Sequence, residues 1–287
     1  MTCALYCVLT NEQGRCFVST NRITKTLTEL KQKSKKALVT YIVNGDPRPE
    51  ITLKAMHSLV EHGADIIELG VPFSDPMAEG EVIQRGHERA LKHHASLSSS
   101  IEVVREFRKT NMSTPIVLMG YANPVERMGY EVFAQRAKKA GVDGLLTVDL
   151  PPEEAEELNV HLKNNGIENI FLIAPTSTKE RMAKVSSLAG GFVYYVSLKG
   201  VTGAGHLDVN SVRDVIGQLR TYTDLPVLAG FGIKDAASAT SVGKVSDGVI
   251  VGSALVSMMS DGSISHDDVH EKFGSILKPM RKALDRL

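Results

Sequence analysis

The chain has 287 residues, of which 43% are hydrophobic and 23% are charged, the composition of a globular protein with a substantial core. Lys and Arg together number 33, as do Asp and Glu, so the net charge is zero and gives nucleic acid or an anionic membrane no basic excess to attract. No apolar run approaches the roughly 20 residues that a transmembrane helix requires.

Residues 1–20 are expected to form a disordered N-terminal extension. They contain all three cysteines, Cys3, Cys7 and Cys16. No further metal ligand or partner motif lies nearby, so free thiols are the favoured interpretation and a metal site the disfavoured one. This segment also lacks the basic leader and cleavage site of a signal peptide. With no cysteine elsewhere, a reducing cytoplasm is the expected location.

Residues 21–287 are expected to form one domain. An additional N-terminal helix is predicted over Asn21–Lys35, with Asn21 or Thr24 as its N-cap, and it is expected to pack below a barrel formed by the rest of the chain. Amphipathic stretches that predict further helices follow along the chain: Glu50–Glu61, Glu131–Lys139, Glu153–Lys163, Lys179–Leu188 and Val209–Leu219.

Eight short apolar runs alternate with these helical stretches. They are rich in Val, Ile and Leu and nearly continuous, which is typical of strands buried on both faces of a parallel sheet. Eight β/α units in this length favour a closed (β/α)8 TIM barrel over an open sheet, and a Rossmann sheet would need Gly-x-Gly-x-x-Gly where the chain has Asn44-Gly45-Asp46-Pro47. The predicted strands are Ala37–Val43, Asp65–Gly70, Pro115–Tyr121, Asp143–Val148, Asn169–Ala174, Gly191–Ser197, Leu225–Gly230 and Asp247–Gly252.

Three strands are preceded by related phrases, Gly63-Ala64-Asp65, Gly141-Val142-Asp143 and Ser246-Asp247-Gly248. Each is interpreted as a helix C-cap glycine, a tight turn and then a strand. Two loops are unusually long. Pro72–Leu97, after the second strand, is expected to carry a short extra helix over Gly80–His93, and Ser197–Leu207, after the sixth, has the glycine content of a mobile lid.

Glu68 is the strongest candidate for a catalytic residue. Side chains alternate along a strand, so Ile66 and Glu68 face one way while Ile67 and Leu69 face the other. An inward carboxylate at the carboxyl end of a strand lies where these barrels keep their catalytic groups. Burying it without a partner costs several kcal/mol, roughly. We therefore favour a functional role over a structural ion pair with a neighbouring strand.

Other acids give a weaker signal. Glu79 and Glu81 lie in the loop after the second strand, where acids are usually only solvated. Asp149 ends the fourth strand and is either catalytic or a cap for the next helix. His266 and His270 have the spacing of a tail helix and are interpreted as part of its solvated face, with Asp267 and Asp268 beside them, and no metal site is predicted.

Glycines end the seventh and eighth strands, in Gly230-Phe231-Gly232-Ile233 and Gly252-Ser253-Ala254. Glycine lets backbone N–H groups approach an anion closely, and the loops after strands seven and eight are the recurrent phosphate site of this fold. One such pair is commonly only a turn. The two pairs together, at these two strands, predict a phosphate site.

The run from Glu68 to Pro76, Glu-Leu-Gly-Val-Pro-Phe-Ser-Asp-Pro, resembles the signature of the tryptophan synthase alpha chain family, barrels that cleave indole-3-glycerol phosphate to indole and glyceraldehyde 3-phosphate. The resemblance covers roughly Asn21 to the C-terminus. It continues through Gly45-Asp46-Pro47, Met119-Gly120-Tyr121-Ala122-Asn123-Pro124, Gly200-Val201-Thr202-Gly203-Ala204, Gly230-Phe231-Gly232-Ile233 and Gly252-Ser253-Ala254.

The resemblance implies a retro-aldol cleavage with Glu68 as general acid/base. It also implies that Glu79 stabilises positive charge at the indole N–H, although the family usually has Asp at this position. Two further departures are Glu81, where the family most often has Pro and which should loosen the loop, and Leu198 in the lid, where many relatives carry Arg.

The resemblance also implies a binding site for the substrate. Phosphate is expected on the backbone N–H groups of Gly203, Gly232, Gly252 and Ser253, with Thr202 on the closing lid and Tyr121 also in the site. The apolar slot for the ring is expected to be lined by Tyr41, Ile83, Leu146, Val148, Leu172, Tyr194 and Phe231.

The implied partner is a tryptophan synthase beta chain in an α2β2 tetramer. Pyridoxal phosphate is expected only in that beta chain, with no cofactor in this chain, and the contact region is matched by Phe73–Met77 and Asn123-Pro124. Two alternatives remain at this point. One is an enzyme of a neighbouring step on an anthranilate-derived sugar phosphate, although its ring-closing form would need a strand-end Lys that is missing. The other is a non-catalytic or weakly catalytic activator of a beta chain.

Overall fold

Eight parallel strands close into a barrel in the computed structural model, which describes residues 21–196, 209–230 and 232–287. Each strand pairs with the next, and β8 pairs with β1 to complete the circle. The predicted barrel is confirmed; the predicted extension and lid lie outside the described residues. The strands are β1 (Ala37–Val43), β2 (Ile66–Gly70), β3 (Ile116–Gly120), β4 (Gly144–Thr147), β5 (Glu168–Ile173), β6 (Val193–Val196), β7 (Val227–Gly230) and β8 (Gly248–Val251).

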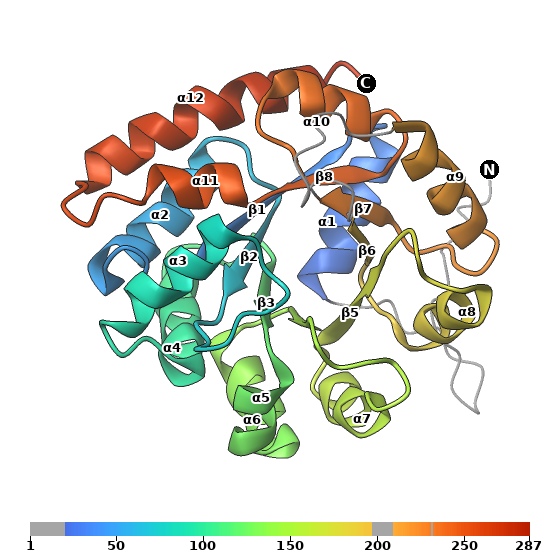
Figure 1. Cartoon of the computed structure of the whole chain (residues 1–287), viewed down its shortest axis with the longest axis horizontal. Coiled ribbons are helices and arrows are strands. Elements are labelled where there is room, and N and C mark those ends of the chain that lie inside the picture. Colours follow the sequence, from blue (N-terminus) through green and yellow to red (C-terminus); the bar gives the residue numbers. More distant parts are fainter. Residues whose placement is uncertain (1–20, 197–208, 231) are drawn as a thin grey trace.

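Helices surround the strands, as Figure 1 shows in a view along the barrel. The ring contains α2 (Pro49–Glu61), α4 (Leu97–Arg108), α6 (Tyr130–Ala140), α7 (Glu156–Asn164), α8 (Lys179–Leu188), α9 (Val209–Leu219), α10 (Ala236–Gly243) and α12 (His266–Leu284). Shorter helices, α3 (Glu81–Leu91), α5 (Ala122–Met128) and α11 (Ser253–Met258), follow β2, β3 and β8. The predicted helix in the loop after the second strand is α3, and the predicted tail helix with His266 and His270 is α12, whereas α4, α5, α10 and α11 were not predicted.

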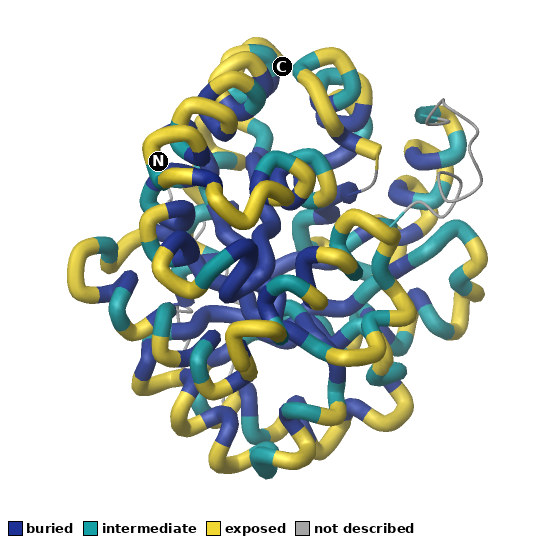
Figure 2. Tube along the Cα trace, turned by 60° about the vertical axis from the view of Figure 1, so that its left-hand side comes forward, coloured by how far each residue is buried: buried dark blue, intermediate teal, exposed yellow. Residues whose placement is uncertain are grey.

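Alternation along the strands divides the apolar residues into two layers. In β2, Ile67 and Leu69 belong to the large cluster between sheet and helices, while Ile66 belongs to a smaller cluster inside the barrel. Figure 2 shows the strands buried at the centre and exposed residues on the outer helices. The predicted inward direction of Glu68 is therefore confirmed, because it alternates with Ile67 and Leu69.

Helix α1 (Arg22–Gln32) closes the amino end of the barrel, as predicted. Its Ile23 and Leu27 pack into the cluster inside the barrel. Asn21 is the N-cap: its side-chain oxygen accepts from the Ile23 amide at 2.8 Å, and its Nδ2 donates to the carbonyls of Asp143 and Gly166 at 2.8 and 2.9 Å. Asn21 thus caps the helix and also attaches it to two neighbouring β/α units.

The interpretation of the three glycine phrases is correct for two and wrong for the third. Gly63 follows the end of α2 and Gly141 ends α6, both with positive φ, the conformation that favours glycine after a helix. Before β8, however, α10 ends at Gly243 with Lys244 as its C-cap in the right-handed region. Gly248 is the first residue of β8 and not a cap, because the phrase places its glycine after the Asp.

The aspartates of these phrases share one structural role. Each accepts a hydrogen bond from the first or second backbone N–H of the strand preceding its own, and each pairs with an Arg side chain from a helix or its end. The sets are Asp65 with the Leu38 amide and Arg281, Asp143 with the Ile116 amide and Arg108, and Asp247 with the Val227 amide and Arg220, at 2.7–3.0 Å. The amino end of the barrel is therefore stabilised by repeated ionic contacts, as expected for the end without chemistry.

Candidate active site

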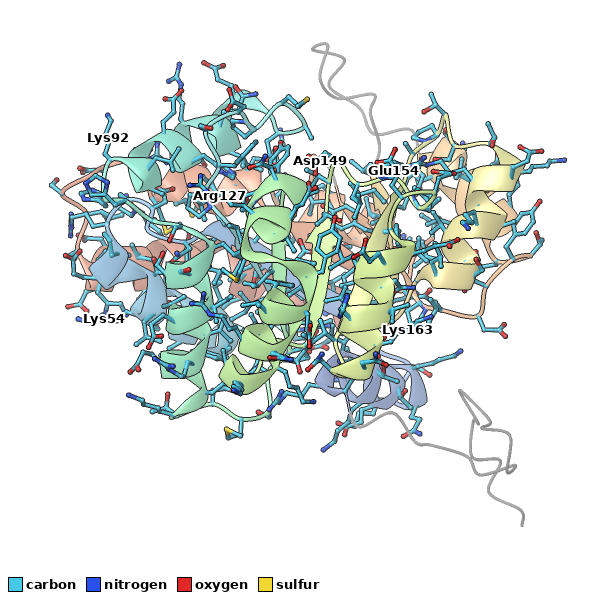
Figure 3. The ribbon with its side chains drawn as sticks, turned by 90° about the horizontal axis from the view of Figure 1, so that it is seen from below. Lys54, Lys92, Arg127, Asp149, Glu154 and Lys163 are labelled. Carbon is cyan, nitrogen blue, oxygen red and sulfur yellow. The ribbon has the colours of Figure 1, made fainter. Side chains whose placement is uncertain are left out.

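The candidate residues gather at the end of the barrel opposite α1. Figure 3 views the barrel from the side and places Asp149 and Glu154 at that end, with Lys163 near α1. Parallel strands bring their carboxyl ends to one rim, so the residues that end β1, β2, β7 and β8 lie together there.

Glu68 is fully buried in β2, between Tyr41 of β1 and Val117 of β3 in the strand register. Neither carboxyl oxygen has a hydrogen-bond partner among the described residues. Burial raises the pKa of Glu68 to about 8, because the charged form loses its hydration without a compensating contact. A carboxyl group in this setting can give and take a proton near neutral pH, and the described residues offer no ion-pair partner for a structural role.

Glu79 lies in the loop after β2, half-buried, and it is oriented by Tyr121. The Tyr121 hydroxyl donates to Glu79 Oε2 and accepts from the Ala78 amide at 2.9 Å. Burial raises the pKa of Glu79 to about 7, while the bond from Tyr121 opposes that rise. The sequence pattern alone favours a solvated acid at Glu79, because nothing in that pattern indicates that Tyr121 lies beside Glu79.

Glu81 begins α3 and forms an ion pair with Arg85 one turn later. The first helical position tolerates Pro, as in most of the family, and also favours an acid near the helix amino end. The Gln84 side chain donates to the carbonyls of Glu79 and Pro76, at 2.8 and 3.4 Å. These two bonds connect the loop to the helix without a proline.

The described strand residues predicted for the ring slot lie inside the barrel, and Ile83 packs against them from α3. Val148, Leu172 and Tyr194 are partly buried against the inner cluster that contains Leu146. Tyr41 and Ile83 belong to a neighbouring cluster with Val256. Met119 of β3 contacts both clusters and was missed, although its spacing of two residues from inward-facing Val117 would have indicated it.

Two glycines at strand ends make room for tyrosine side chains. A Cβ at Gly70 would collide with the Tyr41 hydroxyl, and a Cβ at Gly230 would collide with the Tyr194 hydroxyl. Both tyrosines therefore lie flat across the neighbouring strand, inside the barrel mouth. His87, on α3, contacts the Tyr41 hydroxyl and was also not predicted as a site residue.

Gly232 and Gly252, two of the glycines predicted to bind phosphate, follow the adjacent strands β7 and β8. Gly232 has a positive φ of 65° and is exposed. Gly252 immediately precedes α11, and its carbonyl accepts from the Leu255 and Val256 amides. Ser253 and Ala254 are the first two residues of α11, so their amides have no acceptor within the helix. Thr202, Gly203, Phe231 and Leu198 lie outside the described residues.

Asp149 is exposed and has a capping role. It accepts from the amide of Ala122, the first residue of α5, at 2.8 Å. The predicted cap of the next helix is wrong, since α7 begins after Ala155. Among the described residues, no three His, Cys, Asp or Glu side chains gather closely enough to hold a metal ion. No helix in the described part of the chain is long and apolar enough to cross a membrane.

Comparison with known proteins gives a consistent result. A family model described as tryptophan synthase alpha chain matches residues 27–285. The tryptophan synthase alpha chain of Marinobacter nauticus is 53% identical over 267 residues, 93% of this chain and 99% of that protein. That of Methylococcus capsulatus is 51% identical over 92% of this chain and 99% of its own. The solved alpha subunit from Legionella pneumophila superimposes with a TM-score of 0.87 at 45% identity, over 93% of this chain and 100% of that one.

Proposed function

The chain belongs to the tryptophan synthase alpha chain family, carbon–carbon lyases of tryptophan biosynthesis that cleave indole-3-glycerol phosphate, and on this premise we propose that Glu68 and Glu79 perform the cleavage. The observation that carries the proposal is Glu68, a fully buried carboxyl group at the barrel mouth with no hydrogen-bond partner among the described residues. Such a group is suited to moving a proton between two atoms of a bound substrate.

The reaction needs two proton transfers, one from Glu68 to the ring and one from the substrate hydroxyl back to Glu68. With its pKa raised to about 8, Glu68 is mostly protonated at neutral pH and gives a proton to the substituted carbon of the indole ring. The ring then carries positive charge at its N–H. Glu68, now ionised, takes the proton of the adjacent side-chain hydroxyl. A carbonyl forms, the carbon–carbon bond breaks, and its electrons return to the ring, which leaves indole and glyceraldehyde 3-phosphate.

Glu79 acts on the charge that appears between these two steps. Its carboxylate accepts a hydrogen bond from the ring N–H and offsets the positive charge, with one oxygen fixed by Tyr121. Glu is one methylene longer than the usual Asp. The bonds from Gln84 to the loop carbonyls hold the loop in a position from which the longer side chain reaches Tyr121.

The remaining site residues bind the two ends of the substrate. The indole ring occupies the slot formed by Tyr41, Ile83, Leu146, Val148, Leu172, Tyr194 and Phe231, and Met119 joins this lining. The phosphate group is bound by the amides of Gly232, Gly252 and Ser253, after β7 and β8. The segment with Thr202 and Gly203 is assigned to close over the substrate.

The partner is a tryptophan synthase beta chain, in an α2β2 assembly, to which the released indole passes. Pyridoxal phosphate is assigned to the beta chain and no cofactor to this chain. Met77, in the contact region indicated by the family resemblance, has 79% of its surface exposed, an apolar side chain open to a partner. We place the enzyme in the cytoplasm.

Release of indole from indole-3-glycerol phosphate tests this function, measured with and without a beta chain. Glu68→Gln is expected to lower the rate by about 10²- to 10⁴-fold, because a positioned acid/base contributes roughly this much. Glu157→Gln, the same change on the exposed face of α7, is the matched control and should keep full activity. More than about a tenth of the parental rate in Glu68→Gln would remove Glu68 from the mechanism. An inactive parent that still stimulates a beta chain would support the activator hypothesis.

A further inference from the structure

His87 is a buried histidine of α3 that contacts both the loop after β2 and the wall of the site. The Phe73 amide donates to its Nδ1 at 3.0 Å, and its Nε2 lies 3.3 Å from the Tyr41 hydroxyl oxygen. A backbone N–H only donates, so Nδ1 must accept. Burial lowers the pKa of His87 to about 4, so the ring is neutral near pH 7 and its one proton is on Nε2. His87 therefore donates to Tyr41.

This contact determines what the Tyr41 hydroxyl can do. Its oxygen already accepts from His87, which leaves its own hydrogen available for another acceptor. Burial and the nearby carboxyl groups of Glu79 and Glu68 raise the pKa of Tyr41 well above its usual value, so the hydroxyl keeps its proton. Tyr41 is thus a hydrogen-bond donor held in place at the mouth of the barrel.

The Tyr41 side chain spans the route between the two ends of the substrate. A Cβ at Gly252 would lie 3.5 Å from Tyr41 Cβ and Cδ1, so the side chain starts beside the proposed phosphate site. Its hydroxyl ends against Gly70, two residues beyond Glu68 in β2. Because β1 lies between β8 and β2 in the barrel, the proposed positions of phosphate and indole put the three-carbon linker next to Tyr41.

That linker carries two hydroxyl groups. Glu68 deprotonates the one next to the ring in the proposed mechanism, and the other needs a partner inside the barrel. We propose that Tyr41 donates a hydrogen bond to this second glycerol hydroxyl, and that His87 is a positioning residue that holds Tyr41 in the orientation to do so. This inference rests on the proposed function and adds a determinant of substrate specificity, where the sequence indicated only an apolar wall.

Two ligands separate this role from a structural one. The first is indole-3-glycerol phosphate; the second is the indole-3-propyl phosphate analogue, which lacks both hydroxyls. Tyr41→Phe is expected to lower kcat/KM for the substrate roughly threefold to tenfold, mainly through KM, the usual effect of one hydrogen bond between neutral groups. Its inhibition constant for the analogue should stay unchanged. Tyr222→Phe, at an exposed position, is the control and should change neither value. An unchanged kcat/KM in Tyr41→Phe, or an equal loss for both ligands, would overturn the inference.

A double-mutant cycle tests the positioning role of His87. His87→Leu is expected to show the same ligand-selective loss and to have little further effect in the Tyr41→Phe background, because it acts through the hydroxyl that is already absent. His87→Gln, which keeps a donor and an acceptor, should retain more of the selectivity than Leu. Additive losses, or a loss that follows the thermal stability of the variants, would exclude the role. If Tyr41→Phe is unaffected while the parent releases indole, only the inference fails; a parent that releases none contradicts the proposed function itself.

Discussion

Glu68 and Glu79 reach raised pKa values through different surroundings. Glu68 is enclosed in the barrel with no hydrogen-bond partner among the described residues, and burial alone raises its pKa to about 8. Glu79 is partly open and accepts a bond from Tyr121, which keeps its pKa lower, at about 7. At neutral pH the first is mostly protonated and the second is partly ionised. Two carboxyl groups can therefore hold different roles in one site, with each role set by the environment.

Tyr121→Phe is expected to shift the pH dependence of cleavage. The proposed mechanism requires ionised Glu79 and protonated Glu68, so kcat/KM should rise through about pH 7 and fall above about pH 8. The Tyr121 bond stabilises ionised Glu79 and lowers its pKa; without it, that pKa rises and the acidic limb moves to higher pH. The decrease in kcat/KM should be largest below pH 7, while the basic limb of the pH profile, set by Glu68, stays in place.

The kcat/KM profile of Tyr121→Phe between about pH 5.5 and 9 decides this, with Tyr130→Phe on α6 as the control. Glu79→Gln should lose most activity at every pH. An acidic limb that stays in place, or one that moves to lower pH, would show that Tyr121 does not set the ionisation of Glu79.

Among the elements, α1 stabilises the fold from the amino end of the barrel, opposite the candidate active site. Asn21→Ala removes the cap of α1 and two bonds to neighbouring β/α units, and should lower the free energy of unfolding by roughly 1–3 kcal/mol. The steady-state rate of the folded protein should hardly change. Denaturant titration and the indole assay measure the two effects. Thr24→Ala, at the other predicted cap, should lower the free energy of unfolding by less than Asn21→Ala does. An equal or larger decrease would contradict the role given to Asn21.

The start of α11 allows a test of the phosphate site. A methyl group at Gly252 would meet Tyr41 and Ile83 only at 3.5–3.8 Å, ordinary contact distances, and φ there is −121°. Gly252→Ala should therefore fold normally but obstruct the anion, raising KM about tenfold or more, equivalent to the loss of one or two charge-assisted hydrogen bonds.

Titration calorimetry with glycerol phosphate checks this, with Gly217→Ala on α9 as the control, because a Cβ there has open space. Gly232 is the poorer position, since its φ of 65° strains any other residue. Unaltered affinity in Gly252→Ala would exclude the proposed phosphate site.

At the scale of the whole molecule, the stabilising ionic contacts and the candidate active site lie at opposite ends of the barrel. The amino end carries α1 and the ionic contacts of Asp65, Asp143 and Asp247. The carboxyl end carries Glu68, Glu79 and the exposed Met77. A beta chain that receives indole is therefore expected to bind at the carboxyl end, next to the proposed active site.

Met77→Glu is expected to weaken the response to a beta chain and to leave the rate of the isolated chain unchanged. The new charge would have to lose its hydration in an apolar interface, while the side chain takes no part in catalysis. Titrating a beta chain into the indole assay measures the response. Val160→Glu, at an exposed position on α7, should leave it unaltered. Equal responses from parent and Met77→Glu would place the interface elsewhere.

Local patterns in the sequence determined most of the architecture. The apolar runs and the helical stretches between them have periods set by backbone geometry alone, so they predicted the eight strands, the barrel and the inward direction of Glu68. The cap glycines at 63 and 141 could be predicted for the same reason, since capping acts over a few residues, and the cap of α1 was narrowed to Asn21 or Thr24.

Tertiary structure alone decided which side chains meet. Asp149 caps a helix 27 residues earlier in the chain, Tyr121 reaches Glu79 across 42 residues, and His87 reaches Tyr41 across 46. The shift of the pKa of Glu68 likewise follows from burial on every side, which no segment of the sequence specifies. A repeating pattern fixes which way a residue points, whereas its partner and its solvation depend on how distant strands and loops come together.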